Sequence, residues 1–517
     1  MKRSAVVGVA CALLSISGPV QTPIVAAGSS CEGLRSLTLN NARVTAATEV
    51  PAGTFLPPVP DGGRGVPPAA AKAYAALPSF CRVQVTATPT GDSDVKVEVW
   101  LPTQGWNGKF QAVGNGGWAG TISYTALAAA VAGGYASAST DTGHSTPGGD
   151  FAIGHPEKLV DYAHRAIHEM TVQSKAMVNA YYGSAAKISF WNGCSTGGRQ
   201  GIAEASMYPA DFDGIVAGAS PHPSSRLHAI RLAASFVVNR SADSAIPSAK
   251  FPLVHNAVLD ACDTLDGVKD GVIENPTRCR FDPAVLACKD GDGPSCLTAP
   301  QVETARMLYA DVKHPVTGRV LYPPLLQPGS ELAWGTLAGQ TPFPNAVDGF
   351  KVLVAKDPSW DWRTFKPAVD IDRMEELGSV IDTARPNLKP FFDRGGKLLM
   401  YHGWADRQVP AMSSVSYYSQ VLDAVGRSAA GKSIQLYMVP GMDHCQGGPG
   451  TDTFDKMAAI EEWVAKGTAP NAIVASHAAN GRVDRTRPLC PYPQVARYKG
   501  TGSIDSAESF VCAVDAK

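Results

Sequence analysis

The stretch Gly193-Cys194-Ser195-Thr196-Gly197 lies between an apolar run at residues 188–192 and a segment with helical spacing at residues 199–207. A serine between two glycines at such a strand-to-helix junction is typical of a nucleophile elbow, the sharp turn that presents a catalytic hydroxyl. The glycines suit this turn because a Cβ atom beside the serine would crowd the strained backbone. The pattern is short, and a glycine-rich turn without catalytic function would also produce it.

Two downstream loops supply the other groups that a serine nucleophile needs. The apolar run 397–401 leads to Asp406, and the run 434–439 leads to His444. Serine, acid, histidine is the chain order of an α/β-hydrolase triad, and loops that follow parallel strands meet at one edge of the sheet. We therefore predict that Ser195 attacks an ester carbonyl, that His444 accepts the serine proton, and that Asp406 orients the imidazole.

Cysteines adjoin both of the predicted reacting groups. Cys194 directly precedes Ser195, and Cys445 directly follows His444. A serine and a histidine within hydrogen-bond reach, roughly 2.6–3.2 Å, would bring these cysteines close to the Cα separation of a disulfide, about 5.5–6 Å. One geometric hypothesis thus accounts for four residues, and it predicts a Cys194–Cys445 disulfide.

Nearby residues are weaker candidates or leave a choice open. Asp443 is adjacent to the histidine, and neighbouring side chains rarely point at each other, whereas His402 is predicted to be a structural loop histidine. The oxyanion hole should use the backbone N–H of Thr196 and a second N–H from the Gly-Asn-Gly-Gly run after an early strand. The sequence does not decide whether Gly116 or Gly117 supplies that second donor.

The N-terminus and the composition predict an exported protein, either secreted or periplasmic. A basic start, an apolar stretch and small residues make residues 1–27 a predicted signal peptide. Of 11 cysteines, Cys11 falls in this segment, and the even remainder suits an oxidising compartment. A net charge of −1 and 18% charged residues argue against nucleic acid or an anionic membrane as partner. Oligomeric state stays open.

Strand and helix signals alternate on both sides of an irregular, Pro-rich middle segment. Residues 83–88 and 95–100 alternate with period two and predict a β-hairpin. Further strands are predicted at 110–113 and 215–218, and helices at 162–181, 413–424 and 454–466. This alternation predicts an α/β fold with a mainly parallel sheet. We expect a catalytic domain formed by residues 28–220 and 385–517, with residues 221–384 as an insertion.

An acidic loop in the insertion predicts a cation site. The run Cys262-Asp263-Thr264-Leu265-Asp266-Gly267-Val268-Lys269-Asp270-Gly271-Val272 places three carboxylates and two turn glycines in a short space. Oxygen ligands of this kind suit a hard cation such as calcium, although the spacing is not that of an EF-hand. The alternative is a solvated acidic turn. Zinc is not expected, because the chain contains no CxxC pair.

Two other patterns match ligand motifs without the required context. Residues 426–433 match the P-loop pattern, but a predicted helix precedes them and a predicted strand follows. His164 and His168 are four apart on a predicted helix, with no glutamate in register for a metalloprotease. We expect neither nucleotide nor metal at these positions.

The chain resembles the tannase/feruloyl esterase family of secreted α/β-hydrolases, which includes the hydrolase of mono(hydroxyethyl) terephthalate. The resemblance covers nearly the whole chain after the signal segment. It is carried by Trp106-Asn107-Gly108-Lys109-Phe110, Gly114-Asn115-Gly116-Gly117, Thr140-Asp141-Thr142-Gly143-His144, Cys194-Ser195-Thr196-Gly197-Gly198-Arg199-Gln200-Gly201 and His444-Cys445.

This resemblance implies an α/β-hydrolase fold with a large inserted lid domain, the triad named above, and a calcium site. The calcium ligands that it implies are the side chains of Asp263, Asp266 and Asp270 and the carbonyls of Val268 and Val272. Besides Cys194–Cys445, it implies four further disulfides: Cys31–Cys81, Cys262–Cys279, Cys288–Cys296 and Cys490–Cys512.

The lid sets substrate choice in this family. In the lid, Trp360, Trp362 and Arg363 are candidate substrate contacts, although lid core or surface is an equally good interpretation of them; Val409, after the acid loop, is a further candidate. The expected activity is hydrolysis of aromatic acid esters, feruloyl-type hydroxycinnamates first, with gallate esters (tannase) and terephthalate monoesters as alternatives. From another class, an inactive phenolic- or carbohydrate-binding module on the same scaffold is the second hypothesis, against which the complete triad argues.

Overall fold

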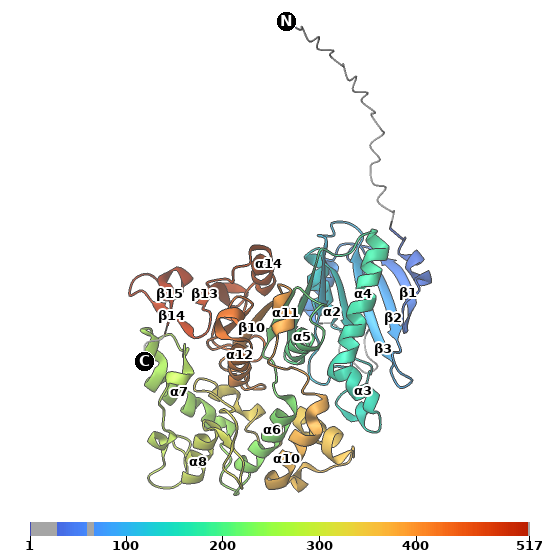
Figure 1. The fold of residues 1–517 in the computed structure, drawn as a ribbon. Coiled ribbons are helices and arrows are strands. Elements are labelled where there is room, and N and C mark those ends of the chain that lie inside the picture. Colours follow the sequence, from blue (N-terminus) through green and yellow to red (C-terminus); the bar gives the residue numbers. More distant parts are fainter. Residues whose placement is uncertain (2–27, 59–66, 515–517) are drawn as a thin grey trace.

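The computed structural model describes residue 1 and residues 28–58 and 67–514 (Figure 1). The predicted signal segment, residues 1–27, therefore lies outside the described residues apart from Met1. In the part that is described, no helix combines the length and the apolar character that a membrane crossing requires.

A nine-stranded mixed sheet forms the centre of the protein, with the strand order β1-β2-β3-β5-β4-β6-β7-β10-β11. Its strands are β1 (Ala42–Val50), β2 (Phe80–Ala87), β3 (Val95–Pro102), β4 (Lys109–Val113), β5 (Ala136–Thr140), β6 (Ile188–Cys194), β7 (Gly214–Gly218), β10 (Lys397–Gly403) and β11 (Ile434–Val439). The pairs from β1 to β5 are antiparallel, and those from β5 to β11 are parallel. The predicted hairpin is β2–β3, and the predicted α/β-hydrolase fold is confirmed.

Helices cover both faces of this sheet because its strands are apolar on both sides. In β6, Phe190 packs into the core on one face and Trp191 into the core on the other, and both are fully buried. On the Trp191 face lie α4 (Ala166–Tyr182), α5 (Thr196–Met207) and α12 (Met412–Val425). On the opposite face lie α2 (Tyr124–Ala132) and α14 (Lys456–Lys466). The helices thereby enclose the sheet on both faces and support the loops at its edge.

The chain between β7 and β10 contributes no strand to the central sheet. It forms α6 (Ser224–Val238), α7 (Phe251–Cys262), α8 (Ala299–Leu308), α9 (Pro344–Phe350), α10 (Pro367–Leu377) and a small ribbon of β8 (Val312–Lys313) and β9 (Val320–Tyr322), and it returns to the sheet through α11 (Lys389–Asp393). Its buried residues form one core that also contains Trp118 and Tyr162. The insertion therefore packs against the hydrolase part, below the sheet in Figure 1.

The remaining elements lie at the periphery. They include α1 (Pro68–Ala75), α3 (Pro156–Val160), α13 (Arg427–Ala430) and two C-terminal hairpins, β12 (Ile473–Ala479) with β13 (Arg482–Leu489) and β14 (Gln494–Tyr498) with β15 (Phe510–Val514). The P-loop-like residues 426–433 fall on α13, after a helix and before β11, which is the reverse of the P-loop context.

All five expected disulfides are present. Their Cα separations are 5.5 Å for Cys31–Cys81, 6.0 Å for Cys194–Cys445, 5.4 Å for Cys262–Cys279, 4.9 Å for Cys288–Cys296 and 5.4 Å for Cys490–Cys512. The first joins the N-terminal segment to β2, and the second joins the two predicted catalytic loops.

Candidate active site

Ser195 stands at the turn between β6 and α5 in a strained conformation. Its φ is 61° and its ψ is −126°, a region that few residues other than glycine adopt. Its N–H donates to the Gly218 carbonyl at 3.0 Å, which anchors the turn to β7. A Cβ on Gly193 would lie 2.5 Å from the backbone of Gly197, so the turn requires glycine at position 193. This geometry is that of a nucleophile elbow.

Asp406 and His444 meet at the same edge of the sheet, in the loops after β10 and β11. The Nδ1 of His444 lies 2.7 Å from Oδ2 of Asp406. The other carboxylate oxygen, Oδ1, accepts the N–H groups of Gln408 at 2.7 Å and Val409 at 2.9 Å. A neutral imidazole that donates from Nδ1 keeps Nε2 free to accept a proton.

His402 is a second partner of the same carboxylate. It is fully buried in β10, and its Nε2 lies 3.1 Å from Oδ2 of Asp406 while its Nδ1 lies 2.8 Å from the Ser414 hydroxyl. Burial by itself would raise the pKa of Asp406, but the charges and hydrogen bonds of His444 and His402 hold that pKa well below its ordinary value. Sequence reasoning predicted a structural role for His402 but not this contact, because spacing along a strand and its loop does not indicate which side chains meet.

The disulfide brings Ser195 and His444 into the same neighbourhood. The Cα atoms of Cys194 and Cys445 are 6.0 Å apart, and Cys445 has a positive φ of 65°. Among the described residues no hydrogen bond joins the Ser195 hydroxyl to His444, and catalytic hydrogen bonds are often loose in ligand-free sites. The structure thus shows the acid–histidine half of the predicted triad as a direct contact.

A cavity of about 120 Å³ opens beside Ser195. Thr196, Gly117 and Val409 line it, whereas Gly116 does not. The Thr196 hydroxyl donates to the Gly117 carbonyl at 2.6 Å, so the two predicted oxyanion-hole segments are in contact. Of the two glycines that the sequence left open, Gly117 is the one at the cavity.

The three lid residues that the sequence suggested as substrate contacts lie outside this cavity. Trp360 stacks on Phe350 with ring centroids 4.2 Å apart, and Trp362 packs edge-on against Phe236. The Arg363 side chain is 69% exposed and pairs with an aspartate at 3.2 Å. None of the three lines the cavity beside Ser195. The two tryptophan rings pack within the lid, and a substrate contact by any of the three residues stays a prediction.

The acidic loop is organised around its own backbone. Asp263 accepts the N–H groups of Asp270 at 3.2 Å and Gly271 at 3.0 Å, and Asp266 accepts that of Val268 at 3.0 Å. Burial, together with the nearby charges of Asp270 and Asp263, raises the pKa of Asp266 to about 6. Three carboxylates in one short loop, with oxygen donors alone, are of the kind that suits a calcium ion.

One contact competes with a cation at this loop. The carboxylate of Asp270 forms an ion pair with Arg487 of β13, and Arg485 lies 3.7 Å away. A cation site usually needs several ligand atoms close together. In the described chain the carboxylate oxygens of Asp263, Asp266 and Asp270 do not all lie within 4.8 Å of one another. Any cation here would therefore depend on the backbone carbonyls of Val268 and Val272 as well.

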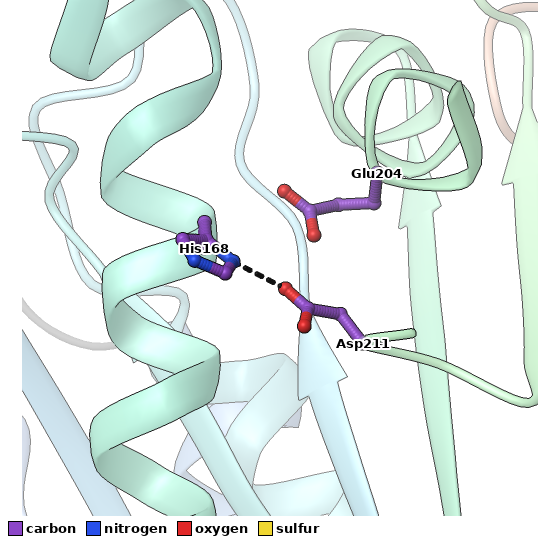
Figure 2. A group of neighbouring side chains, drawn as sticks. All are labelled: His168, Glu204 and Asp211. Carbon is purple, nitrogen blue, oxygen red and sulfur yellow. Dashed lines mark hydrogen bonds and ion pairs between the residues drawn. The ribbon is translucent and has the colours of Figure 1, made fainter. Parts of the chain in front are cut away.

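The group that does gather within 4.8 Å consists of His168, Glu204 and Asp211 (Figure 2). Nδ1 of His168 lies 2.7 Å from Asp211, and His164 bonds the Tyr208 hydroxyl at 2.8 Å. Both histidines of the i, i+4 pair thus have protein partners.

A retained proton on the carboxyl group of Glu204 explains how this side chain can be buried within the group. It is 1% exposed, and neither carboxylate oxygen accepts a hydrogen bond from a donor of the described chain. Figure 2 shows its carboxyl pointing toward that of Asp211. Burial and the Asp211 charge raise the pKa of Glu204 well above its ordinary value, so it stays protonated and can donate to Asp211.

Comparison with known proteins agrees with these features. The family described as tannase and feruloyl esterase matches residues 81–513, which is most of the chain. The chain belongs to this family.

Relatives within the tannase and feruloyl esterase family match most of the chain. An uncharacterized esterase of Xanthomonas campestris pv. campestris is 36% identical, covering 94% of this chain and 91% of its own length. A probable feruloyl esterase B of Aspergillus clavatus is 32% identical, with coverages of 94% and 95%. The solved feruloyl esterase B from Aspergillus oryzae is 31% identical with a TM-score of 0.86, covering 93% of this chain and 99% of its own. The tannin acyl hydrolase from Aspergillus niger, 22% identical with a TM-score of 0.76, shares the fold.

Removing the Cys194–Cys445 disulfide should lower catalysis. The double variant Cys194→Ala/Cys445→Ala should lose about 10- to 100-fold in kcat/KM on a 4-nitrophenyl ester, because a displacement of about 1 Å at a catalytic group has effects of that size. The matched control is Cys288→Ala/Cys296→Ala, which removes a lid disulfide with a sequence separation of only 8. Unchanged kinetics in a folded Cys194→Ala/Cys445→Ala protein would contradict the bracing role.

Substituting Glu204 should change how stability depends on pH. An acid whose folded-state pKa is raised above its ordinary 4.5 holds its proton more tightly when folded, so the free energy of unfolding falls as the pH rises from there. Glu204→Gln keeps a neutral donor and should remove that part of the slope. Urea unfolding between pH 5 and pH 9 measures it; parallel curves for variant and wild type would show that Glu204 is ionised in the folded protein.

Proposed function

We propose that this protein is a serine esterase that hydrolyses aromatic acid esters, with feruloyl-type hydroxycinnamates as the favoured class. The observation that carries the proposal is the His444–Asp406 contact at the same sheet edge as the strained Ser195, tied together by the Cys194–Cys445 disulfide. Membership of a family whose relatives are named esterases and feruloyl esterases supports it. Gallate esters and terephthalate monoesters remain the alternatives within the class.

In the proposed mechanism the Ser195 hydroxyl attacks the ester carbonyl while His444 accepts its proton. The imidazolium that forms is stabilised by Asp406, whose low pKa keeps it ionised throughout the reaction. His444 then protonates the departing alcohol, and the acyl group stays on the serine oxygen. Water, deprotonated by His444, attacks the acyl-enzyme and releases the acid, restoring Ser195.

The oxyanion of each tetrahedral intermediate needs preorganised donors. We assign this role to the backbone N–H groups of Thr196 and Gly117, because both residues line the cavity and contact each other. The N–H of Thr196 is the first of α5, where the positive end of the helix dipole adds to the stabilisation. The hydroxyl of Thr196 fixes the second segment rather than reaching the substrate.

An aromatic acid part agrees with the cavity beside Ser195. The rings of Trp118, Tyr162 and Phe343 line it, and its volume of about 120 Å³ is of the order of an apolar cavity known to hold benzene, about 150 Å³. A cavity of this size has room for one aromatic ring. The alternative of an inactive phenolic- or carbohydrate-binding module finds no support, because no member of the predicted triad is missing.

We also propose that the protein is exported and that its acidic lid loop binds calcium as a structural ion. Five disulfides are typical of oxidising compartments. For calcium we propose the side chains of Asp263, Asp266 and Asp270 with the carbonyls of Val268 and Val272; the crowded carboxylates support it, and the Arg487 ion pair weighs against it. When bound, the ion would offset the carboxylate repulsion in the loop.

Ser195→Ala should abolish esterase activity. Loss of the nucleophile from an acyl-enzyme mechanism costs roughly 10⁴-fold or more in kcat, measurable with a 4-nitrophenyl ester and with methyl ferulate. A thermal melt of the variant checks that it folds. Undiminished turnover would remove Ser195 from the mechanism.

Metal analysis tests the calcium proposal directly. Purified protein should contain about one calcium ion per chain, and mild chelation should lower the melting temperature because bound metal stabilises the folded state. Asp266→Asn should weaken retention, whereas Asp282→Asn, which removes an exposed lid carboxylate outside the loop, should not. Protein that holds no calcium before chelation would establish the solvated acidic turn instead.

A further inference from the structure

Three side chains that can ligate a metal ion meet on the outer side of the nucleophile helix, away from the catalytic residues. His168 on α4, Glu204 on α5 and Asp211 in the loop before β7 each present one ligand atom, and these atoms all lie within 4.8 Å of one another (Figure 2). Of the residues that the structure describes, only these form such a group. The sequence did not indicate it, because its members come from three separate elements.

The carboxyl group of Glu204 is the feature that points to a ligand. Glu204 is 1% exposed, neither of its carboxylate oxygens accepts a hydrogen bond within the described chain, and Figure 2 shows it directed at Asp211. Two ionised carboxylates so close together repel each other, and either a shared proton or a cation relieves that repulsion. The proton engages only the two acids. A divalent cation in the same place would engage His168 as well and would replace the proton, which leaves to solvent.

The charges of the group match those of a divalent cation. Glu204 and Asp211 together supply two negative charges. Lys175 of α4 is also present, but its ammonium donates to the backbone carbonyl of Asp211 and not to the carboxylate. Both carboxylates therefore remain available, and the lysine charge reduces the affinity for a cation without blocking the ligand atoms.

The ligand types select the metal. One imidazole nitrogen with two carboxylate oxygens suits zinc and similar transition-metal ions, whereas calcium and magnesium prefer oxygen alone. The Tyr208 ring stacks on the imidazole of His168, with ring centroids 4.0 Å apart, and holds it in position. The His168 side chain is 31% exposed, so ions can reach the group and water can supply a fourth ligand.

The distances require only small side-chain movements. Nδ1 of His168 lies 2.7 Å from Oδ2 of Asp211. Two ligand atoms on a tetrahedral zinc ion, with bonds of about 2.0–2.1 Å, are about 3.3 Å apart. The imidazole and the Asp211 carboxylate would therefore separate by about 0.6 Å, and the Glu204 carboxyl would move toward them.

We propose that His168, Glu204 and Asp211 form a site for a structural divalent transition-metal ion, zinc in the first place, which clamps α5 to α4. Ser195 is the residue that precedes the first turn of α5, so the clamp would hold the helix on which the nucleophile turn is built. This inference goes beyond the proposed function and does not depend on it, because it concerns metal binding and stability.

Zinc titration of chelator-treated protein tests the site. In the presence of excess calcium, calorimetry should show about one zinc ion bound per chain, and the melting temperature should rise with the zinc concentration because the ion binds the folded state. Excess calcium saturates sites built from oxygen alone, such as the acidic lid loop, and should leave the imidazole site to zinc. Absence of zinc binding, or its displacement by calcium, would overturn the proposal.

Ligand variants locate the bound ion. Glu204→Gln and His168→Gln should each weaken zinc binding by more than ~10-fold, since even the loss of a partner behind a metal ligand has an effect of that size. The matched control is His477→Gln, because Nδ1 of His477 lies 2.7 Å from Asp484 in a similar pair that has no third ligand. The control should keep the wild-type affinity. Unchanged affinity in Glu204→Gln, or an equal loss in His477→Gln, would contradict the assignment.

A variant that gains affinity remains informative if a ligand variant fails to fold. Lys175→Gln keeps a donor for the Asp211 carbonyl and removes a positive charge that acts on Glu204. It should therefore tighten zinc binding at least ~3-fold, which a folding defect cannot do. Unchanged or weaker binding would place the ion elsewhere.

Ser195→Ala separates this site from the proposed esterase. The variant should bind zinc as wild type does, since Ser195 is not a ligand. Wild-type protein that binds zinc but hydrolyses no ester would refute the esterase function and leave the metal site standing. Protein that hydrolyses esters but binds no zinc would refute the metal site alone.

Discussion

The Cys194–Cys445 disulfide is the constraint on which the arrangement of the site depends. In the sheet, β6 and β11 are separated by β7 and β10, so the strands that carry these two loops lie about 14 Å apart at the usual strand spacing of about 4.8 Å. The cysteine Cα atoms are nevertheless 6.0 Å apart. The loop after β11 must therefore fold back across the ends of β7 and β10, and it carries His444 with it. The sequence separation of 251 residues makes this a long-range closure that neither loop could impose alone.

With that loop in place, the carboxylate of Asp406 becomes the local centre of the site. It is fully enclosed, so its charge is tolerated only because two imidazoles and two backbone N–H groups bond it. These partners fix the orientation of the Asp406 carboxylate. The carboxylate in turn selects the His444 tautomer that carries its proton on Nδ1. His402 acts through Asp406 rather than on substrate. It links the acid loop to Ser414 of α12, so a helix of the scaffold fixes the position of the catalytic acid.

The sequence predicted those strands and helices whose apolar residues recur with a regular spacing. The β2–β3 hairpin alternates, and β6, β7, β10 and β11 are apolar runs between turn signals. β5 was not predicted because Ala136-Ser137-Ala138-Ser139-Thr140 contains only small residues, although all five are buried. The hairpin β12–β13 was hidden for the opposite reason, since exposed charged residues dominate β13. In the lid, α6 is buried on nearly every side, which leaves no polar stripe to reveal a helix.

The residues of the candidate site also differ in whether the sequence could predict them. Ser195, Asp406, His444 and their cysteines follow from order and adjacency, which a sequence displays, and Val409 follows from its place after the acid loop. Trp360 and Trp362 were chosen for their chemistry, but their ring partners within the lid decide their place. Arg231 and His228, which also line the cavity beside Ser195, look ordinary in the sequence, as polar residues at helical spacing. What distinguishes them is one buried nitrogen each without a hydrogen-bond partner in the described chain, Nε of Arg231 and Nδ1 of His228, and only the folded chain can display that.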